Sequence, residues 1–179
     1  MNSTPELTFL PLAPDHVSEA YVAGLNDRDV VRLTEARHRT WTLGDVTAYV
    51  RADALDDTVR LYGVFVDGKR HIGNIRLSAI SMRHRHCYLG YMIFDRSMWG
   101  RGYGTAAVNE ACRLAFHELD LHRICADYYA VNTASARVFE KTGFTIEGVY
   151  RDHFILDGQF IDSVRVAKRR SDGGSGVRP

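Results

Sequence analysis

The apolar residues of this chain change from a helical to an alternating spacing near residue 60. Two alternating runs, 61–66 and 72–77, flank Asp67-Gly68, a dipeptide that accepts the positive φ of a tight hairpin turn. A further strand is predicted at 87–94. The sequence therefore predicts three antiparallel strands in succession before the central helix.

That helix is predicted to bury one face. Its apolar residues recur at the helical positions i, i+3, i+4, i+7 and i+11, from Val108 to Leu119. The elements predicted after it are a strand at 123–129, a helix between Asn132 and Gly143, and two long strands at 144–154 and 160–168. The second half of the chain therefore mixes strands and helices.

The first 60 residues are predicted to be mostly helical. A short strand at 7–12 comes first, and Asp15 is a candidate cap for the helix that follows it. Turn residues then divide the stretch to residue 56 into two or three short helices around Trp41. The whole order of elements predicts an α/β fold.

Length and composition are those of one folded domain. The chain has 179 residues, of which 45% are hydrophobic and 25% charged, and a core of this size can stand alone. We predict a single domain at 1–168. The glycine- and serine-rich end has little apolar surface to bury, so residues 169–179 are predicted to be a disordered tail.

Charge and cysteine content limit the partners and the compartment. A net charge of +1 gives no bulk basic surface to attract nucleic acid or a membrane. No run reaches the ~18 apolar residues that a membrane span requires. Cys87, Cys112 and Cys125 have no paired metal spacing, so we predict no metal site and expect buried thiols in a reducing, cytoplasmic compartment.

A glycine-rich segment immediately precedes the central helix. Gly100, Gly102 and Gly104 let backbone N–H groups approach a ligand, and helix N-termini attract anions. Arg96 and Arg101 add cationic donors suited to phosphate. The segment has neither a Walker loop nor the G-x-G-x-x-G spacing of a dinucleotide-binding fingerprint. It therefore predicts a diphosphate site of another kind.

The motifs around this segment resemble those of a known family. Residues 101–106, Arg-Gly-Tyr-Gly-Thr-Ala, are similar to the Q/R-x-x-G-x-G/A signature of the GCN5-related N-acetyltransferases (GNAT). Further motifs resemble the ribosomal-protein alanine acetyltransferase (RimJ/RimL) branch of that family: Leu89-Gly90-Tyr91, His122-Arg123, Asn132-x-x-Ser135, Glu140-Lys141-Thr142-Gly143-Phe144 and Asp157-Gly158-Gln159. The resemblance covers roughly residues 60–168.

This resemblance implies the GNAT fold, a mixed, splayed sheet of about seven strands with about four helices on its two faces. It also implies acetyl-CoA as co-substrate, with the pantetheine arm between two parted strands. The residues implied at the cofactor are Tyr91, Met92 and Ile93 along the arm, Arg96, Arg101, Gly102, Tyr103, Gly104 and Thr105 at the pyrophosphate, and Asn132 and Ser135 beside them. Asn132 fits a plain helix cap equally well.

The implied reaction is acetyl transfer to a primary amine, which needs an acceptor for the amine proton and a proton for the departing thiolate. Phe139 stands where many members of the wider family have a proton-donating tyrosine, so Ser135 is the candidate acid, or a second helix-end residue. Tyr88 stands where this branch often has a glutamate. The base is unassigned, and the alternatives are His84, His86 and Glu35.

The sequence leaves the acceptor open. The helices before residue 60 are expected to form its wall, and the candidate substrate-contacting residues are Glu35, Trp41 and Tyr88. The acceptor is either a peptide or protein N-terminus or a small amine such as an aminosugar, antibiotic or polyamine. A non-catalytic acyl-CoA-binding module is a third hypothesis. The long closing strands could also pair in a homodimer.

Overall fold

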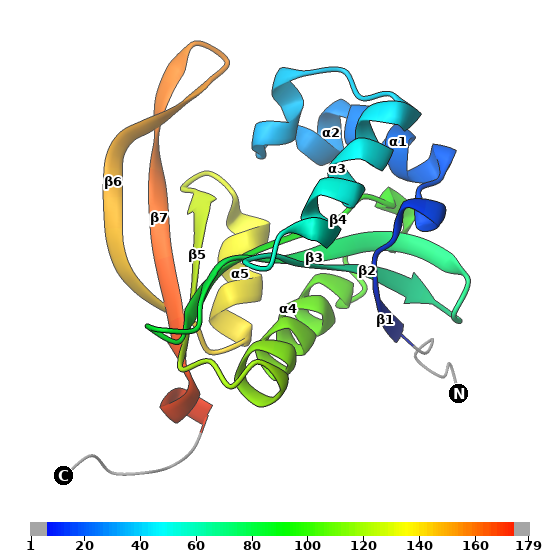
Figure 1. Cartoon of the computed structure of the whole chain (residues 1–179). Helices are drawn as coiled ribbons and strands as arrows, with labels where there is room; N and C mark the ends of the chain where they lie inside the picture. Colours follow the sequence, from blue (N-terminus) through cyan, green and yellow to red (C-terminus); the bar gives the residue numbers. More distant parts are fainter. Residues whose placement is uncertain (1–6, 174–179) are drawn as a thin grey trace, which may run out of the picture.

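One mixed β-sheet organises the molecule. The computed structural model describes residues 7–173, in which seven strands follow the spatial order β1-β2-β3-β4-β5-β7-β6 (Figure 1). All neighbouring strands run antiparallel except β4 and β5. The strands are β1 Leu7–Pro11, β2 Arg60–Val66, β3 Arg70–Ser81, β4 His86–Ile93, β5 Arg123–Tyr129, β6 Thr145–Leu156 and β7 Gln159–Arg169. The predicted α/β class and seven-stranded sheet are confirmed.

The hairpin of β2 and β3 forms where the alternating pattern predicted it. Asp67 and Gly68 have φ values of 51° and 66°, the left-handed conformation that a tight hairpin turn requires. Ile75 and Leu77 of β3 are fully buried in the core that α4 covers. Because a slip of one residue would turn both side chains toward the other face, their burial fixes the register of the strand.

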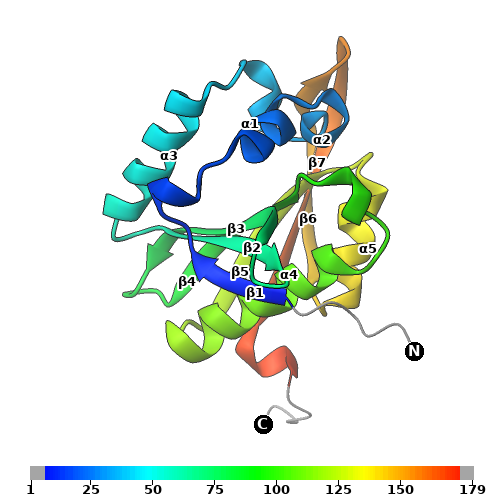
Figure 2. The same ribbon diagram turned by 90° about the vertical axis from the view of Figure 1, so that its right-hand side faces the viewer.

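Helices cover both faces of the sheet (Figure 2). One layer consists of α1 Glu19–Asn26, α2 Arg28–Val31 and α3 Leu43–Leu55, and the other of α4 Tyr103–Arg113 and α5 Thr133–Lys141. The described residues therefore contain five α-helices, one more than expected. Each layer has its own core: Val108 and Ile124 belong to the one that α4 covers, and Val46 and Val50 to the one that α3 covers.

The first helix starts later than predicted. Asp15 lies inside the short 3-10 helix η1 Pro14–His16, where the His16 ring accepts the Ala13 N–H at 3.0 Å. The cap of α1 is Ser18, whose hydroxyl oxygen accepts the Tyr21 N–H. Asp15 is therefore not the cap. No helix within residues 7–173 is long and apolar enough to span a membrane.

The predicted tail begins with ordered structure. Strand β7 continues to Arg169, and residues 170–173 form the 3-10 helix η5. Arg170 pairs with Asp120 at 2.7 Å and donates to the Phe116 carbonyl oxygen. The prediction of disorder is therefore wrong for residues 169–173, because local composition does not reveal these distant partners. Residues 174–179 lie outside the described part of the chain.

Candidate functional site

The two central strands part after a short paired stretch. Strands β4 and β5 are paired only where residues 86–88 face 123–125. Beyond Tyr88 and Cys125, β4 continues to Ile93 and β5 to Tyr129 without pairing to each other (Figure 1). Facing backbone groups of two parted strands are free to bind an extended ligand between them.

The N-terminus of α4 stands apart from the other helix starts. Side chains cap α1, α2, α3 and α5, whereas α4 starts at Gly102 without a side-chain cap, the only such case among the α-helices of residues 7–173. The first helical hydrogen bond runs from the Ala106 N–H to the Gly102 carbonyl oxygen at 3.0 Å. The amides of Tyr103, Gly104 and Thr105 therefore have no partner within the helix. Unpaired amides at a helix start form a site for an anion.

The three glycines before and in this helix have different roles. Gly100 and Gly102 have φ values of 73° and 86°, and a Cβ on either would meet open space. Their requirement for glycine is conformational. At Gly104, a Cβ would lie 3.3 Å from the Tyr91 ring and 3.6 Å from Val138. We call the unpaired stretch between residues 89–93 of β4 and 126–129 of β5 the slot. Gly104 is needed for close packing against Tyr91, so a substitution there would disturb the slot as well as the loop.

The two arginines of the predicted phosphate site differ. Arg101 is exposed, and no ion pair holds it within the described residues. The Arg96 guanidinium instead pairs with Asp29 at 2.7 Å and with Asp27 at 3.5 Å. The prediction of Arg96 as a pyrophosphate ligand is therefore not supported by this geometry, because α2 supplies carboxylates that the local sequence does not reveal.

Three other predicted cofactor residues are also used differently. The Tyr103 side chain is buried in the core, so only its amide faces the helix start. The Ile93 carbonyl oxygen accepts a hydrogen bond of 2.7 Å from the Trp99 indole, which leaves that carbonyl occupied. Met92 packs against the core of α1 and α3. Of the three residues predicted along the arm, Tyr91 therefore has the most direct access to the slot.

Tyr91 joins the parted strand to α5. Its hydroxyl donates a hydrogen bond of 3.2 Å to the Ser135 hydroxyl oxygen, and burial raises the pKa of the Tyr91 phenol. The Asn132 side chain accepts the Ser135 N–H at 3.0 Å. Asn132 is thus the cap of α5, the simpler of its two predicted roles. The Ser135 hydroxyl is not used in that cap and lies beside the slot.

Phe139 occupies the position of the missing tyrosine. Its ring is buried and lies 5.8 Å from both the Tyr91 and the Tyr128 ring. A residue held in this aromatic cluster supplies packing and no proton. The hydroxyl groups of Tyr91 and Ser135 meet beside this cluster.

The candidate acceptor residues Glu35 and Trp41 come from the front helices. Glu35 accepts a hydrogen bond from the hydroxyl of Tyr129, the last residue of β5. Burial and the Glu35 carboxylate raise the pKa of Tyr129 to about 12. Trp41 lies under the Arg39 guanidinium at 4.1 Å and packs against the core of α1 and α3. Glu35 thus reaches the unpaired end of β5, whereas Trp41 packs within the layer of front helices.

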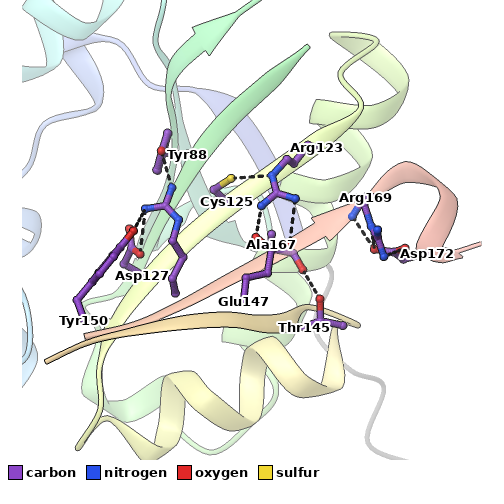
Figure 3. Close-up of polar contacts among 11 residues, drawn as sticks. Tyr88, Arg123, Cys125, Asp127, Thr145, Glu147, Tyr150, Ala167, Arg169 and Asp172 are labelled. Carbon is purple, nitrogen blue, oxygen red and sulfur yellow. Dashed lines mark hydrogen bonds and ion pairs between the residues drawn. The ribbon is translucent and has the colours of Figure 1, made fainter. Parts of the chain in front are cut away.

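Tyr88 belongs to a polar cluster on the sheet face opposite α4 and α5. Its hydroxyl accepts a hydrogen bond from Arg165 of β7, which also pairs with Asp127 of β5 at 3.4 Å. Figure 3 shows Tyr88, Asp127 and Tyr150 converging on this position. Neither Asp127 nor Arg165 was among the site residues predicted from the sequence. The sequence did contain one indication of Asp127, because it is the single charged residue within the otherwise apolar and aromatic run 124–129.

The two histidines proposed as alternative bases lie elsewhere. His86 stands opposite Arg123, where β4 and β5 are still paired. The His84 ring stacks on the His86 ring at 6.1 Å. Both therefore lie at the closed end of the two strands, several residues before the strands part.

A sheet that parts beside an uncapped helix N-terminus is the architecture of an acyl-CoA-binding fold of the GNAT type. The chain belongs to the GNAT acetyltransferase family, because the family model described as Acetyltransferase (GNAT) domain matches residues 6–145.

Comparisons with individual proteins agree with this family. The chain is 34% identical over 114 residues to the ribosomal protein uS5 alanine N-acetyltransferase of Escherichia coli, covering 62% of this chain and 58% of that protein. It is 37% identical over 103 residues to a probable N-acetyltransferase of Bacillus subtilis, covering 56% of each. The chain thus spans little more than half the length of these curated relatives.

A solved structure shares the whole fold. Spermidine N-acetyltransferase from Vibrio cholerae, in complex with CoA and spermine, matches with a TM-score of 0.83 and 22% sequence identity. The match covers 93% of this chain and 96% of that one. At this identity the likeness shows the fold alone.

Proposed function

We propose that this protein transfers an acetyl group from acetyl-CoA to a primary amine. The observation that carries the proposal is the uncapped start of α4 beside the parted strands β4 and β5. Amides there and the exposed Arg101 suit a diphosphate, and the opening between the strands suits a narrow extended arm. These two features therefore suit the diphosphate and the pantetheine arm of CoA. A site for a nucleotide phosphate would need only the first of them.

Ser135 is the proposed acid for the departing thiolate. Its hydroxyl lies beside the slot and accepts the Tyr91 hydrogen bond, so its own proton is free to point elsewhere. A hydroxyl can donate to a thiolate as the carbon–sulfur bond breaks. Phe139 offers no competing proton.

The acceptor is proposed to be either a peptide or protein N-terminus or a small amine. The relative from Escherichia coli is named for an alanine of a ribosomal protein, and a relative from Vibrio cholerae for spermidine. Glu35 and Asp127 supply carboxylates near the open end of β5. These charges suit the ammonium group that both acceptor classes carry.

The test measures thiol release from acetyl-CoA with three amines: a peptide starting with alanine, spermidine and glucosamine. Thermal stabilisation by CoA is measured beside it. We expect stabilisation together with turnover of at least one amine. Stabilisation without turnover would favour the non-catalytic binding module, and absence of both would overturn the assignment of the phosphate site.

We further propose a cytoplasmic location and a homodimer. Three buried free thiols support a reducing compartment. Exposed apolar side chains on the closing hairpin support pairing of two copies: Ile146, Val149, Ile155 and Phe160. Sedimentation velocity of the wild type and of Phe160→Glu tests the dimer, which the charge should weaken.

A further inference from the structure

Asp127 and Arg165 face each other directly on neighbouring strands of the sheet. They are paired residues in the register of β5 and β7, and the guanidinium lies 3.4 Å from one carboxylate oxygen. Arg165 also donates to the Tyr88 hydroxyl from β4 and lies 3.4 Å from the Tyr150 hydroxyl of β6. One guanidinium therefore connects side chains from four strands (Figure 3).

This cluster lies where the strands part. Cys125 is the last residue of β5 that pairs with β4, and Asp127 follows two residues later, a distance of about 6.6 Å along the strand. Ile124 and Ala126 point into the core of α4 and α5. Since side chains alternate along a strand, Asp127 points to the opposite face. The carboxylate thus stands at the mouth of the slot on the face without α4 and α5.

Asp127 remains accessible although Arg165 holds it. Its side chain is 32% exposed, and the single contact recorded for it within residues 7–173 uses one carboxylate oxygen. The other oxygen can accept a hydrogen bond from an incoming cation. The arrangement fixes the carboxylate in place while leaving one side open.

Tyr88 explains why a carboxylate is needed at this place. The side chain that β4 supplies to this cluster is a phenol, which is a poor proton acceptor near neutral pH. It bonds the same guanidinium as Asp127. The proton acceptor of this cluster is therefore the carboxylate one strand away, on the same face of the sheet.

We propose that Asp127 binds the ammonium group of the acceptor and accepts its first proton. This inference rests on the proposed function and assigns the base that the sequence left open. The neutral amine then attacks the carbonyl carbon of the thioester, and the carbon–sulfur bond breaks. The thiolate takes a proton from Ser135, and the second proton of the amine nitrogen returns the Ser135 oxygen to a hydroxyl. Per turnover, one proton leaves through Asp127 to solvent and one ends on the thiol.

The charged and titratable groups around Asp127 come from four strands. Arg165 and Tyr88 face it from β7 and β4, and Tyr150 from β6. On its own strand, Cys125 accepts a hydrogen bond from Arg123 at 3.2 Å. Toward the end of β5, beyond this cluster, Tyr129 donates to Glu35 and its ring lies 5.1 Å from the Arg37 guanidinium. Toward the paired end, Glu147 engages Arg123 with both carboxylate oxygens. Asp127 is thus the carboxylate of this cluster that is open to a substrate.

The experiment compares wild type, Asp127→Asn and Asp127→Glu over pH 6.5–9.5. The acceptors are spermidine and a peptide starting with alanine, and the readout is kcat/KM. At pH 7 we expect Asp127→Asn to lose about 100-fold, the lower end of the range for general bases. The loss should shrink as pH rises, because solvent then deprotonates the amine. It should also be smaller for the peptide, whose amine has a pKa of about 7.7–8.0, against about 10.4 for an alkyl amine.

Glu147→Gln is the matched control. Glu147 is also a carboxylate bound to an arginine on this part of the sheet, but it lies beside Arg123, where β4 and β5 are still paired. We expect this variant to keep the wild-type pH profile. Asp127→Glu should recover part of the activity lost in Asp127→Asn, and all variants should keep the thermal stabilisation by CoA.

Three results overturn the inference. The first is an Asp127→Asn protein that binds CoA and has the wild-type kcat/KM profile. This result would exclude Asp127 as the base and leave the proposed function intact. The second is a wild type that acetylates neither amine, in which case the inference falls together with the function on which it rests. The third is a pH-independent loss of kcat/KM in both Asp127→Asn and Glu147→Gln. That result would assign the loss to sheet packing and overturn the inference.

Discussion

The hydroxyl of Tyr91 on β4 donates a hydrogen bond of 3.2 Å to the hydroxyl oxygen of Ser135 on α5. This bond links the strand that opens the slot to the residue proposed as acid. Because Tyr91 donates, the Ser135 proton is directed away from the phenol. The Tyr91 ring in turn rests against Gly104 of α4, so three elements position one hydroxyl.

The first prediction concerns this pair. Ser135→Ala should lower kcat about 100-fold, as expected for loss of a general acid. Tyr91→Phe removes only the orienting bond and should lower kcat by a smaller factor, with unchanged stabilisation by CoA. The double variant should be no slower than Ser135→Ala, because the two hydroxyls act as a unit. Additive losses in steady-state kinetics would contradict this coupling.

The second prediction concerns the start of α4. Arg101→Ala should weaken CoA binding about tenfold, because it removes a charged donor near the proposed phosphate site. Arg83→Ala is the control, since Arg83 is an exposed arginine in the turn between β3 and β4. Isothermal titration of CoA measures both. Equal affinities of the two variants for CoA would show that Arg101 does not bind the phosphates.

The third prediction concerns acid stability. The Arg123 guanidinium lowers the pKa of the Glu147 carboxyl below its ordinary value near 4.5. The pair therefore stabilises the fold above that pH, and its contribution is lost as pH falls through the lowered pKa. Because both side chains are partly exposed, its worth is about 0.2–1 kcal/mol. The free energies of unfolding in urea of wild type and Glu147→Gln should differ at pH 7 and approach each other as pH falls below 4.5.

The fourth prediction concerns a buried histidine. Burial lowers the pKa of His71, although its ring nitrogen Nε2 contacts the Gly73 carbonyl oxygen and the Asn74 side chain at 3.0 and 2.8 Å. The unfolded state therefore binds more protons below about pH 6.5, so stability falls as pH drops from there.

His71→Phe tests this dependence. At pH 8 the variant should lose about 1–3 kcal/mol, since two buried acceptors lose their donor. Between pH 7 and pH 5 its stability should change less than that of the wild type. Parallel urea midpoints across this range would show that another group causes the slope.

The order of the elements could be predicted because it depends on local patterns. Alternation and Asp67-Gly68 predicted the first hairpin, and the period of Val108 to Leu119 predicted the central helix, which the structure contains as α4 and the π-helical turn η4 Leu114–Glu118. The glycine spacing likewise predicted an open helix start. Each of these features is determined by residues within about ten positions of one another.

The site could be predicted only in part, because its side chains meet across the chain. Arg96 turns to Asp29, which lies 67 positions earlier, and Asp127 meets Arg165, which lies 38 positions later. No local period reveals such partners. Predicting the second contact requires the strand order β4-β5-β7-β6, in which β7 inserts between β5 and β6.

The short pairing of β4 with β5 has a mechanical consequence. Three residue pairs form the whole seam between a half-sheet of β1 to β4 and a half-sheet of β5 to β7. A ligand bound there would link the two half-sheets mechanically along the stretch where no backbone pairing joins them. Binding of that ligand should therefore slow amide exchange more in β5 than in the other strands. The two half-sheets should then unfold in one cooperative transition.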